Sequence, residues 1–208
     1  MNTVQPDDGY IKFACHLIPE IIEIPSSLFD PLNFWREEMW QKAWIGAYPD
    51  GIGYGNISVR IPQSDRFYIS GSATGGIPEL DQIHYPLVEN CDLSQNAIWC
   101  RGVVHASSES MSHAAIYSFN GEIGSVVHIH NHLLWEKYLD ILPSTAKDVE
   151  YGTPEMAYEI IRLMGLPETQ KRKVFVMGGH IDGIISFGKT VEEAARAILA
   201  LDEEKDGV

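Results

Sequence analysis

A strand-like segment with two histidines, in the middle of the chain, constrains the fold more than any other feature. Residues 125–130 read Ser-Val-Val-His-Ile-His, and β-branched residues in such a run favour an extended strand. Because alternate residues of a strand point to the same face, His128 and His130 present two imidazoles to one side. Two buried imidazoles on one face need hydrogen-bond partners or a metal ion, so the segment predicts either a polar core or a metal site.

A metal site at these histidines needs further ligands. Zinc and similar divalent ions bind imidazole nitrogen and carboxylate oxygen at roughly 2.0–2.2 Å and usually take three or four protein ligands. His180 directly follows the strand-like segment 174–179, and Glu109 stands where a helix is expected to begin. With these two residues added, the sequence favours a metal site over a polar core.

Three other histidines stand near these segments without being needed as ligands. His113 follows Glu109 by four residues, a spacing that also occurs in metal motifs, but His180 is the simpler third imidazole. We therefore expect His105 and His113 to lie outside the site. His132 closely follows the strand, and its expected role is to orient a ligand or a substrate.

Small and hydroxyl-bearing residues in three segments are typical of an anion pocket. Ser107 and Ser108 stand at the expected start of a helix through about Phe119, where free amides and the helix dipole favour negative charge. Two glycine-rich turns, at residues 51–55 and 71–76, adjoin short strands, and such turns can present successive amides to an anion. Each feature alone is also typical of an ordinary loop or helix cap.

Strands and helices alternate along the chain, and the connections between strands include hairpins. This alternation predicts an α/β fold with a mixed or mainly antiparallel sheet. Residues 1–29 are expected to be an N-terminal arm or extra element of a single domain that comprises residues 1–208. The expected helices cover residues 31–47, 108–119, 132–142, 154–164 and 191–201, and the clearest expected strands cover residues 56–61, 66–70, 101–105, 125–130, 171–179 and 184–188.

Composition and charge argue against several classes of partner. With 208 residues and 45% hydrophobic content, the chain can form one domain with a large core. Its formal net charge of -14 argues against nucleic acid and anionic membranes, and no apolar run approaches the ~20 residues that span a bilayer. Three cysteines without close spacing and an N-terminus unlike a signal peptide predict a cytoplasmic protein with reduced thiols. A small-molecule substrate, including an anionic one, is compatible with this charge.

Taken together, five segments resemble one known family. They are GYGNISVR at 53–60, SATGG at 72–76, SSE at 107–109, VVHIHNH at 126–132 and GGHIDG at 178–183, the last with a capped helix behind it. In this order they resemble the class II aldolase/adducin family over roughly residues 30–201, which is more specific than any single motif. That family includes zinc-dependent sugar-phosphate aldolases, pentulose-phosphate epimerases, a methylthioribulose-phosphate dehydratase and the non-catalytic adducin head domain.

The resemblance implies a three-layer α/β/α sandwich around a central, mainly antiparallel sheet, often as a homotetramer with sites between subunits. At the matching positions it implies His128, His130 and His180 as metal ligands. It implies that Glu109 ligates the metal at rest and moves a proton in catalysis. The implied cofactor is a divalent metal, Zn²⁺ first, with Mn²⁺, Fe²⁺ or Co²⁺ as the other candidates. The implied substrate or phosphate ligands are Asn56, Thr74, Gly75, Ser107 and Ser108.

The leading functional prediction is a metal-dependent lyase that cleaves a small hydroxy-carbonyl or sugar-phosphate substrate through a metal-stabilised enediolate. Epimerisation or dehydration on the same centre, and a non-catalytic binding module like the adducin head, are the alternatives. A cupin-like oxygenase also uses a His-x-His pair, but Glu136 is too far past His130 and lies in a segment with helical spacing. In the sugar-phosphate aldolases the region after the histidine pair supplies a tyrosine proton donor to the neighbouring subunit's site, and Tyr138 and Tyr151 are both available here.

Overall fold

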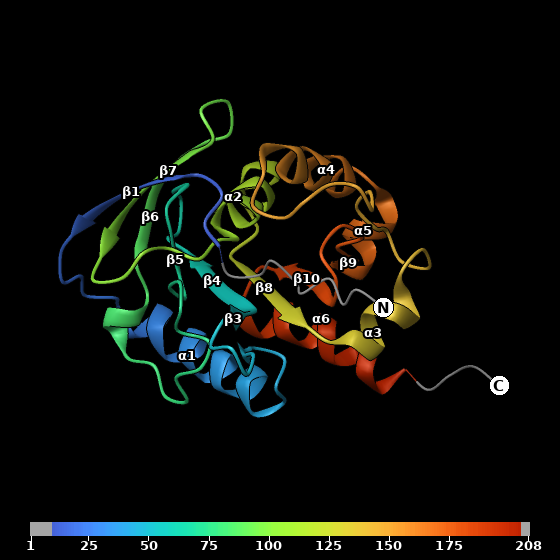
Figure 1. The fold of residues 1–208 in the computed structure, drawn as a ribbon, viewed down its shortest axis with the longest axis horizontal. Coiled ribbons are helices and arrows are strands. Elements are labelled where there is room, and N and C mark those ends of the chain that lie inside the picture. Colours follow the sequence, from blue (N-terminus) through green and yellow to red (C-terminus); the bar gives the residue numbers. More distant parts are fainter. Residues whose placement is uncertain (1–9, 205–208) are drawn as a thin grey trace.

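The computed structural model describes residues 10–204, and its centre is an eight-stranded sheet (Figure 1). Across the sheet the strands are β1 (Ala14–Pro19), β7 (Ala97–Gly102), β6 (Leu87–Asp92), β5 (Phe67–Ile69), β4 (Asn56–Arg60), β8 (Ser125–His130), β10 (Gly183–Gly188) and β9 (Val174–Val176). β1 and β7 run parallel, and each other neighbouring pair is antiparallel. The predicted mainly antiparallel sheet is confirmed.

Helices cover both faces of this sheet. They are α1 (Ser26–Gln41), α2 (Ser110–Phe119), α3 (His132–Tyr138), α4 (Pro154–Met164), α5 (Pro167–Arg172) and α6 (Val191–Glu203), with a short 3-10 helix at Gln82–His84. Along β8, Val127 and Ile129 pack on the side of α1 and α6, whereas Val126 packs on the side of α2 and α4. In Figure 1, α1 and α6 lie below the sheet and α2 and α4 lie above it. The fold is therefore the predicted three-layer α/β/α sandwich.

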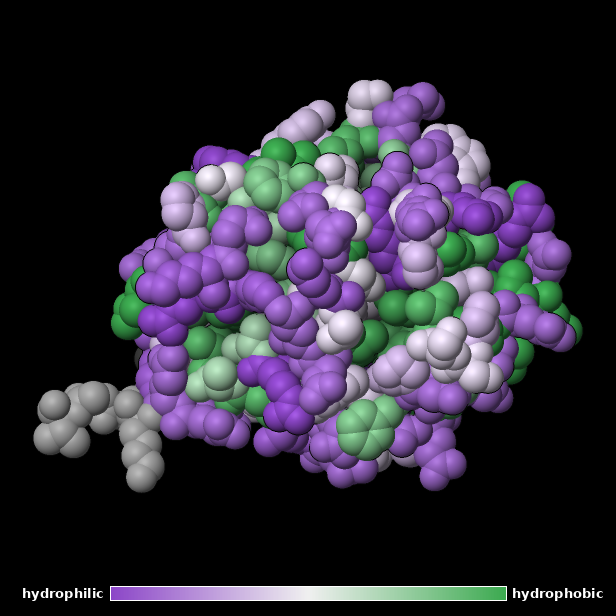
Figure 2. Space-filling model, turned by 180° about the vertical axis from the view of Figure 1, so that it is seen from behind, coloured by the Kyte–Doolittle hydropathy of each residue, from purple (hydrophilic) through white to green (hydrophobic). Residues whose placement is uncertain are grey.

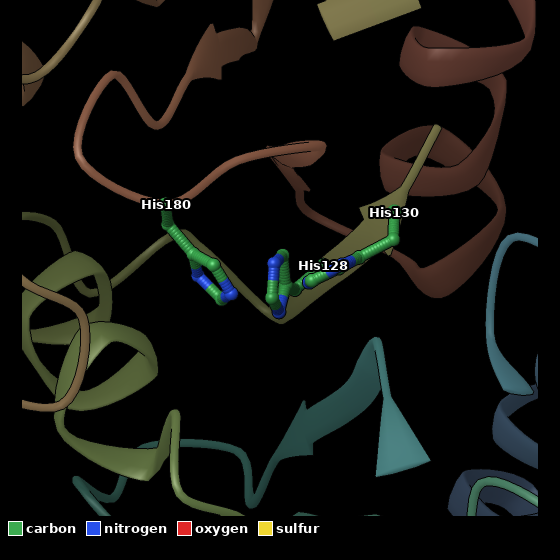
Figure 3. A group of neighbouring side chains, drawn as sticks. All are labelled: His128, His130 and His180. Atoms are coloured by element: carbon green, nitrogen blue, oxygen red, sulfur yellow. The ribbon is translucent and has the colours of Figure 1, made fainter. Parts of the chain in front are cut away.

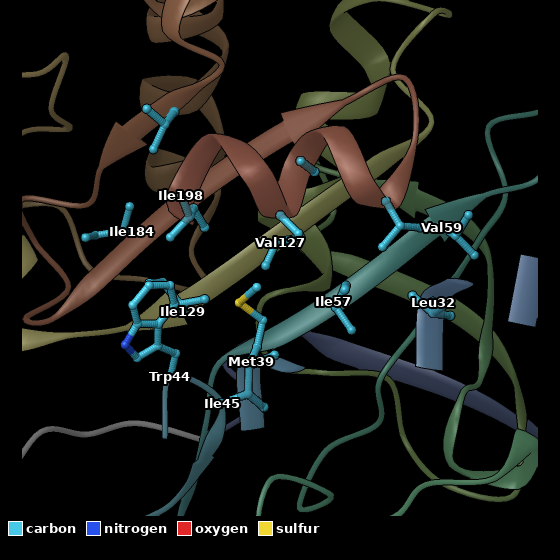
Figure 4. Close-up of a cluster of buried hydrophobic side chains, with 14 of the residues drawn as sticks. Leu32, Met39, Trp44, Ile45, Ile57, Val59, Val127, Ile129, Ile184 and Ile198 are labelled. Carbon is cyan, nitrogen blue, oxygen red and sulfur yellow. The ribbon is translucent and has the colours of Figure 1, made fainter. Parts of the chain in front are cut away.

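The core on the α1 and α6 side holds three central strands together. Met39 of α1 and Ile198 of α6 are fully buried and belong to the same cluster as Ile57 of β4, Ile129 of β8 and Ile184 of β10 (Figure 4). Burying an aliphatic side chain of this size contributes about 1.5–3 kcal/mol. Because the cluster spans β4, β8 and β10, it keeps the ends of these strands side by side.

A short hairpin and a glycine-rich turn lie against each other near the start of β4. The hairpin consists of β2 (Gly46–Ala47) and β3 (Gly53–Tyr54). A Cβ atom at Gly75 would lie only 2.0 Å from the carbonyl oxygen of Gly46, so this close approach requires glycine. Gly55, which joins β3 to β4, has a φ of +70°, a conformation that favours glycine. The two predicted glycine-rich turns therefore form one structural unit.

The N-terminal segment, from residue 10 onward, supplies β1 and the start of α1. β1 extends the sheet at one edge, beside β7. α1 begins at Ser26, one turn before the expected cap at Asp30, so that Pro31 lies inside the helix rather than at its first position. The carbonyl of Pro25 accepts a hydrogen bond from the N–H of Leu28, which starts the helix early.

α1 also ends at Gln41, earlier than the predicted end near Ala47. Ala43 has a φ of +55°, in the left-handed region. Its N–H bonds the carbonyl of Trp40, and the next N–H bonds the carbonyl of Met39, both at 2.9 Å. This pair of bonds is the Schellman motif, which stops the helix and turns the chain towards β2.

Other predicted boundaries also differ from the structure. The strand predicted from Lys171 begins only at Val174, because Pro167 starts α5, which continues through Arg172. β7 lies earlier in the chain than its predicted strand, and α3 ends sooner than expected. The helix α4, the hairpin of β9 and β10, and the cap of α6 by Thr190 match the predictions.

The helices, the surface and the cysteines can be compared with the predictions made from composition. Within residues 10–204, no helix has the length and apolar character to cross a bilayer. The face shown in Figure 2 is largely hydrophilic, and its hydrophobic atoms form separate groups. The three cysteines are free, as predicted, and the Sγ atoms of Cys15 and Cys100 lie 3.6 Å apart.

We predict that Ala43→Gly stabilises the protein by about 1 kcal/mol, because glycine adopts a positive φ without the Cβ penalty. Urea unfolding at neutral pH measures the change. The control Ala200→Gly, at an exposed position inside α6, should destabilise the protein by about 1 kcal/mol. A similar loss of stability in both variants would contradict the role given to Ala43.

Candidate metal centre

Three histidines from two segments converge at one end of the central strands (Figure 3). His128 and His130 are alternate residues at the end of β8, and His180 lies in the turn between β9 and β10. One ligand nitrogen from each ring lies within 4.8 Å of the other two. The side chains are 1%, 6% and 5% exposed, respectively. The structure thus brings together the three imidazoles that were predicted as metal ligands.

Hydrogen bonds at Nδ1 orient the two rings on β8. Asn56 is the cross-strand neighbour of His128, and its amide nitrogen lies 3.3 Å from Nδ1 of that ring. The hydroxyl of Tyr48 lies 3.0 Å from Nδ1 of His130. Nε2 of His128 is buried and has no hydrogen-bond partner among the described residues. Because an unsatisfied buried nitrogen costs free energy, and because a bond at one ring nitrogen typically orients a metal-binding histidine, this geometry fits a metal site.

Burial also affects the protonation of His128. The pKa of His128 lies well below its ordinary 6.5, first because burial disfavours the charged ring, and further because His130 and His180 would repel the charge. The neutral imidazole is the form that binds a metal ion. His128 therefore meets the protonation requirement of a metal ligand at neutral pH.

Glu109 lies beside the histidines, directly before the first residue of α2. Its side chain is 2% exposed, and Oε1 lies 3.5 Å from Nδ1 of His180. The hydroxyl of Ser112, in the first turn of α2, donates a 2.6 Å hydrogen bond to Oε2. The buried carboxylate thus lies directly beside the histidine cluster.

The turn before α2 differs from the prediction. The helix begins at Ser110, after Glu109, rather than directly behind Ser107 or Ser108. The carbonyl of Ser107 accepts the N–H of Ser110 at 3.0 Å, and its Oγ accepts the N–H of Glu109 at 3.2 Å. Ser107 therefore forms a tight turn that places Glu109 at the helix start.

One cavity opens onto the histidines and the carboxylate. Four of the five predicted substrate-binding residues line it, namely Asn56, Gly75, Ser107 and Ser108. The fifth, Thr74, does not line it, because its hydroxyl donates a 2.7 Å hydrogen bond to the carbonyl of Gly71. Thr74 therefore supports the turn instead of facing the cavity.

Several site residues were not predicted from the sequence. Tyr54 lines the cavity, with its ring centroid 5.5 Å from that of His130. Tyr48 reaches His130 from the turn of the β2–β3 hairpin, a contact for which the sequence has no local signal. Ser112 could have been found, because it lies three residues after Glu109 and therefore on the same face of a helix.

The structure separates the two candidate tyrosines. Tyr151 lines the cavity, and its ring stacks on His180 with centroids 4.6 Å apart. The hydroxyl of Tyr138 bonds the carbonyl of Leu201 at 3.1 Å and does not line the cavity. Tyr151 is therefore the tyrosine that the fold of this chain places beside the histidines.

The remaining predicted histidines lie outside the three-histidine cluster. Nδ1 of His113 is 2.7 Å from the hydroxyl of Ser58, and the ring is fully buried on the sheet-facing side of α2. His132 pairs with Asp182 at 2.7 Å, in the turn that also carries His180. It thus contacts the turn of a predicted metal ligand without being part of the cluster, as expected for an orienting residue.

The family comparison agrees with the fold and the site. Residues 48–135 match the profile of the Class II Aldolase and Adducin N-terminal domain. This segment contains the predicted site residues of β4, β8 and the start of α2, and it lacks His180. This match over residues 48–135 bears out the resemblance to the class II aldolase/adducin family that the motifs predicted.

Individual relatives are distant. A methylthioribulose-1-phosphate dehydratase from Leptospira interrogans is 26% identical over 149 residues, which cover 68% of this chain and only 58% of the length of that relative. YgbL from Escherichia coli, a putative aldolase/epimerase/decarboxylase, has a similar structure with a TM-score of 0.63 and 19% identity over 86% of both chains. An L-fuculose-1-phosphate aldolase from Thermus thermophilus gives a TM-score of 0.62 and 20% identity over 86% of this chain and 91% of that chain. These two structures establish the fold.

We predict that His113 makes the metal-free protein less stable in acid. Burial lowers the pKa of His113 from 6.5 to about 3, so the unfolded chain binds a proton that the folded state excludes. This contribution to stability is complete above the unfolded pKa, falls steadily as the pH drops below it, and is fully lost once the pH has fallen through the folded pKa. The free energy of unfolding should drop by about 2 kcal/mol from pH 6.5 to 5 on this account, as measured by urea unfolding.

His113→Asn is the control for this prediction, since asparagine does not titrate and can still bond Ser58. Below pH 6.5, the free energy of unfolding of the variant should fall less steeply with decreasing pH than that of the wild type. The difference between the two slopes should be about 1.4 kcal/mol per pH unit. His128 is present in both proteins, so its titration in the unfolded chain is common to the two. The same slope in the variant and the wild type would show that His113 is not the group responsible.

Proposed function

We propose that the protein is a divalent-metal-dependent lyase of the aldolase type, which cleaves a small hydroxy-carbonyl or sugar-phosphate substrate. The observation that carries this proposal is the cluster of His128, His130 and His180 in one cavity with the buried carboxylate of Glu109. We propose Zn²⁺ as the metal, with Mn²⁺, Fe²⁺ or Co²⁺ as the other candidates, because imidazole and carboxylate donors suit all of them.

In this proposal, each group of residues in the cavity has a distinct role in the reaction. A divalent ion held by the three histidines would polarise the substrate carbonyl and stabilise the negative charge that develops when the carbon–carbon bond breaks. Glu109, which we propose as a ligand at rest, would accept or donate the proton at the neighbouring substrate atom through the oxygen that faces His180. Ser112 would hold the other oxygen in place during this transfer. Tyr151 lines the same cavity and is a candidate proton donor.

We propose that the substrate carries an anionic group, such as a phosphate, at the glycine-rich side of the cavity. Gly75 and Asn56 line the cavity, as do Ser107 and Ser108, which directly precede Glu109 and α2. Amide and hydroxyl groups near a helix N-terminus favour negative charge. Two relatives are themselves named for sugar phosphates, methylthioribulose-1-phosphate and L-fuculose 1-phosphate.

Dehydration is the second candidate reaction. The curated relative that this chain matches is named a dehydratase. Loss of water from a hydroxy-carbonyl compound needs the same carbonyl polarisation and the same proton transfer by a carboxylate such as Glu109. Epimerisation would use these groups as well. The products, rather than the site, distinguish these reactions.

We further propose that residues 1–208 form one domain that assembles as a homo-oligomer, with a tetramer favoured, in the cytoplasm and without nucleic-acid or membrane partners. Leu133 is 77% exposed and Ile181 is 46% exposed. Their segments are joined by a 2.9 Å hydrogen bond from the N–H of Asn131 to the carbonyl of Asp182. Exposed apolar side chains next to a candidate site are suited to a subunit contact. Light scattering on the purified protein measures the oligomeric state.

We predict that Glu109→Gln keeps the fold and the metal ion but lowers kcat by at least ~100-fold, because an amide cannot transfer the proton. Elemental analysis and turnover of the best substrate measure the two effects. The control Glu122→Gln changes a carboxylate that is 73% exposed and should keep the wild-type rate. A wild-type rate in Glu109→Gln would remove Glu109 from the mechanism.

Incubation of the metal-loaded protein with a panel of ketose phosphates, followed by mass spectrometry, tests the reaction type. Two shorter carbonyl products are expected for the lyase. A product lighter by one water would assign the dehydratase, and a product of unchanged mass but altered configuration would assign the epimerase. If the metal-loaded protein turned over no compound of the panel, a non-catalytic module like the adducin head would be the better description.

A further inference from the structure

Arg36 is a charged residue inside the hydrophobic core. It lies on α1 about one helical turn from both Leu32 and Met39, and all three side chains have no exposed surface. Arginine is rarely buried completely unless its charge has a partner. Because burial of a charge costs free energy, a guanidinium on the core-facing side of a helix indicates a specific structural role.

The guanidinium of Arg36 binds the turn that follows β5. Nη1 donates a 2.7 Å hydrogen bond to the carbonyl of Pro78. Nη2 donates to the carbonyls of Thr74 and Gly75, at 3.0 and 3.3 Å. In the part of the chain that the structure describes, this guanidinium forms no ion pair with a carboxylate, so that the carbonyl dipoles of one turn are its direct partners.

These contacts decide where the amides of the turn point. In a trans peptide, the C=O of one residue and the N–H of the next point in opposite directions. Because Arg36 holds the carbonyls of Thr74 and Gly75, the N–H groups of Gly75 and Gly76 face away from it. Gly75 lines the cavity beside the candidate metal centre. Neither amide donates a backbone hydrogen bond within residues 10–204.

The charge of Arg36 has a second consequence. No lysine or arginine lines the cavity among the described residues, so an anion there would meet amides and the hydroxyls of Ser107 and Ser108. Burial lowers the pKa of Arg36, and Tyr85 and Glu37 partly oppose this effect, but a guanidinium stays protonated at neutral pH. The cavity therefore has a fixed positive charge one peptide layer behind its glycine-rich wall.

We infer, on the basis of the proposed function, that Arg36 is a positioning residue for an oxyanion group of the substrate, such as a phosphate. Its guanidinium holds the 74–78 turn so that the amide of Gly75, which lines the cavity, faces the anion and binds it. Its positive charge, set behind this turn, favours the anion over a neutral group. Arg36 acts through the turn and touches neither the substrate nor the metal ion.

Calorimetric titration of the metal-loaded protein with inorganic phosphate tests this inference. Arg36→Met should weaken phosphate binding by about tenfold, because the variant loses both the bracing of the turn and the charge. Arg36→Lys, which keeps the charge without the planar fork, should restore part of the affinity. A parallel titration of the metal-free wild type excludes binding of phosphate to the ion itself. Metal content should be unchanged in each variant.

Arg60→Met is the matched control. Arg60 is also buried and also donates to backbone carbonyls, those of Ser64, Tyr117 and Asn120. It stands at the far end of β4 from Asn56. Its replacement should lower stability and leave phosphate affinity at the wild-type value. Equal weakening of phosphate binding in Arg60→Met and Arg36→Met would reduce the effect to general stability and overturn the inference.

Hydrogen exchange on the wild-type protein tests the turn without any substitution, which keeps the inference falsifiable where a variant does not fold. Phosphate should slow the exchange of the amide of Gly75, which lines the cavity. Unchanged exchange at this amide would overturn the inference.

The outcomes separate this inference from the proposed function. Wild-type phosphate affinity in Arg36→Met would overturn the role of Arg36 and leave the proposed metal-dependent lyase standing. A wild-type protein that binds no phosphate would overturn both this inference and the proposed anionic substrate. Failure of the Glu109→Gln prediction would instead remove the proposed mechanism, whatever Arg36 does.

Discussion

The antiparallel pairing of β4, β8 and β10 is the constraint on which the candidate site depends. Asn56 faces His128 across β4 and β8, and Gly183 faces His130 across β8 and β10. Because side chains alternate along a strand, a slip of β8 by one residue would turn both histidines towards the aliphatic core. Burial of Val127 and Ile129 against α1 and α6 makes that slip unfavourable. The apolar alternation that sets the register therefore also places the imidazoles.

The polar part of the site comes from turns gathered at one end of these strands. α1 shapes two of them while its own buried side chains stay in the core. Ala43, in its left-handed conformation, directs the chain into the β2–β3 hairpin, from which Tyr48 reaches His130. Arg36 holds the glycine-rich turn that includes Gly75. No residue of α1 lines the cavity in the described structure. The helix therefore supports the site only through these turns.

The features that the sequence predicts well are those encoded by local pattern. The spacing of His128 and His130 predicts their shared face, and Thr190 bonds the N–H of Glu193 at 3.1 Å as a helix cap should. Pro31 led to a wrong helix start. Proline is typical of the first turn of a helix, but α1 begins at Ser26 and already includes Pro31. Contacts between distant segments have no such signal.

Arg36 and Thr74 show this limit most clearly. From the sequence alone, an arginine in a helix is predicted to be exposed. The burial of Arg36 could not be predicted, because its three acceptors are backbone carbonyls that lie 38 or more residues away in the chain. Thr74 matches a substrate-binding position of the family by sequence, yet its hydroxyl bonds Gly71 and does not line the cavity. Both outcomes are decided by how the 71–78 turn folds, which no local pattern specifies.

X-ray absorption spectroscopy with elemental analysis, on zinc-reconstituted wild type and His128→Ala, tests the metal centre most directly. The predicted result is one ion per chain, bound through the imidazoles of His128, His130 and His180, and its loss in a folded His128→Ala variant. A wild-type protein that binds no stoichiometric metal after reconstitution, or a metal that the substitution leaves in place, would contradict a centre built from these three rings.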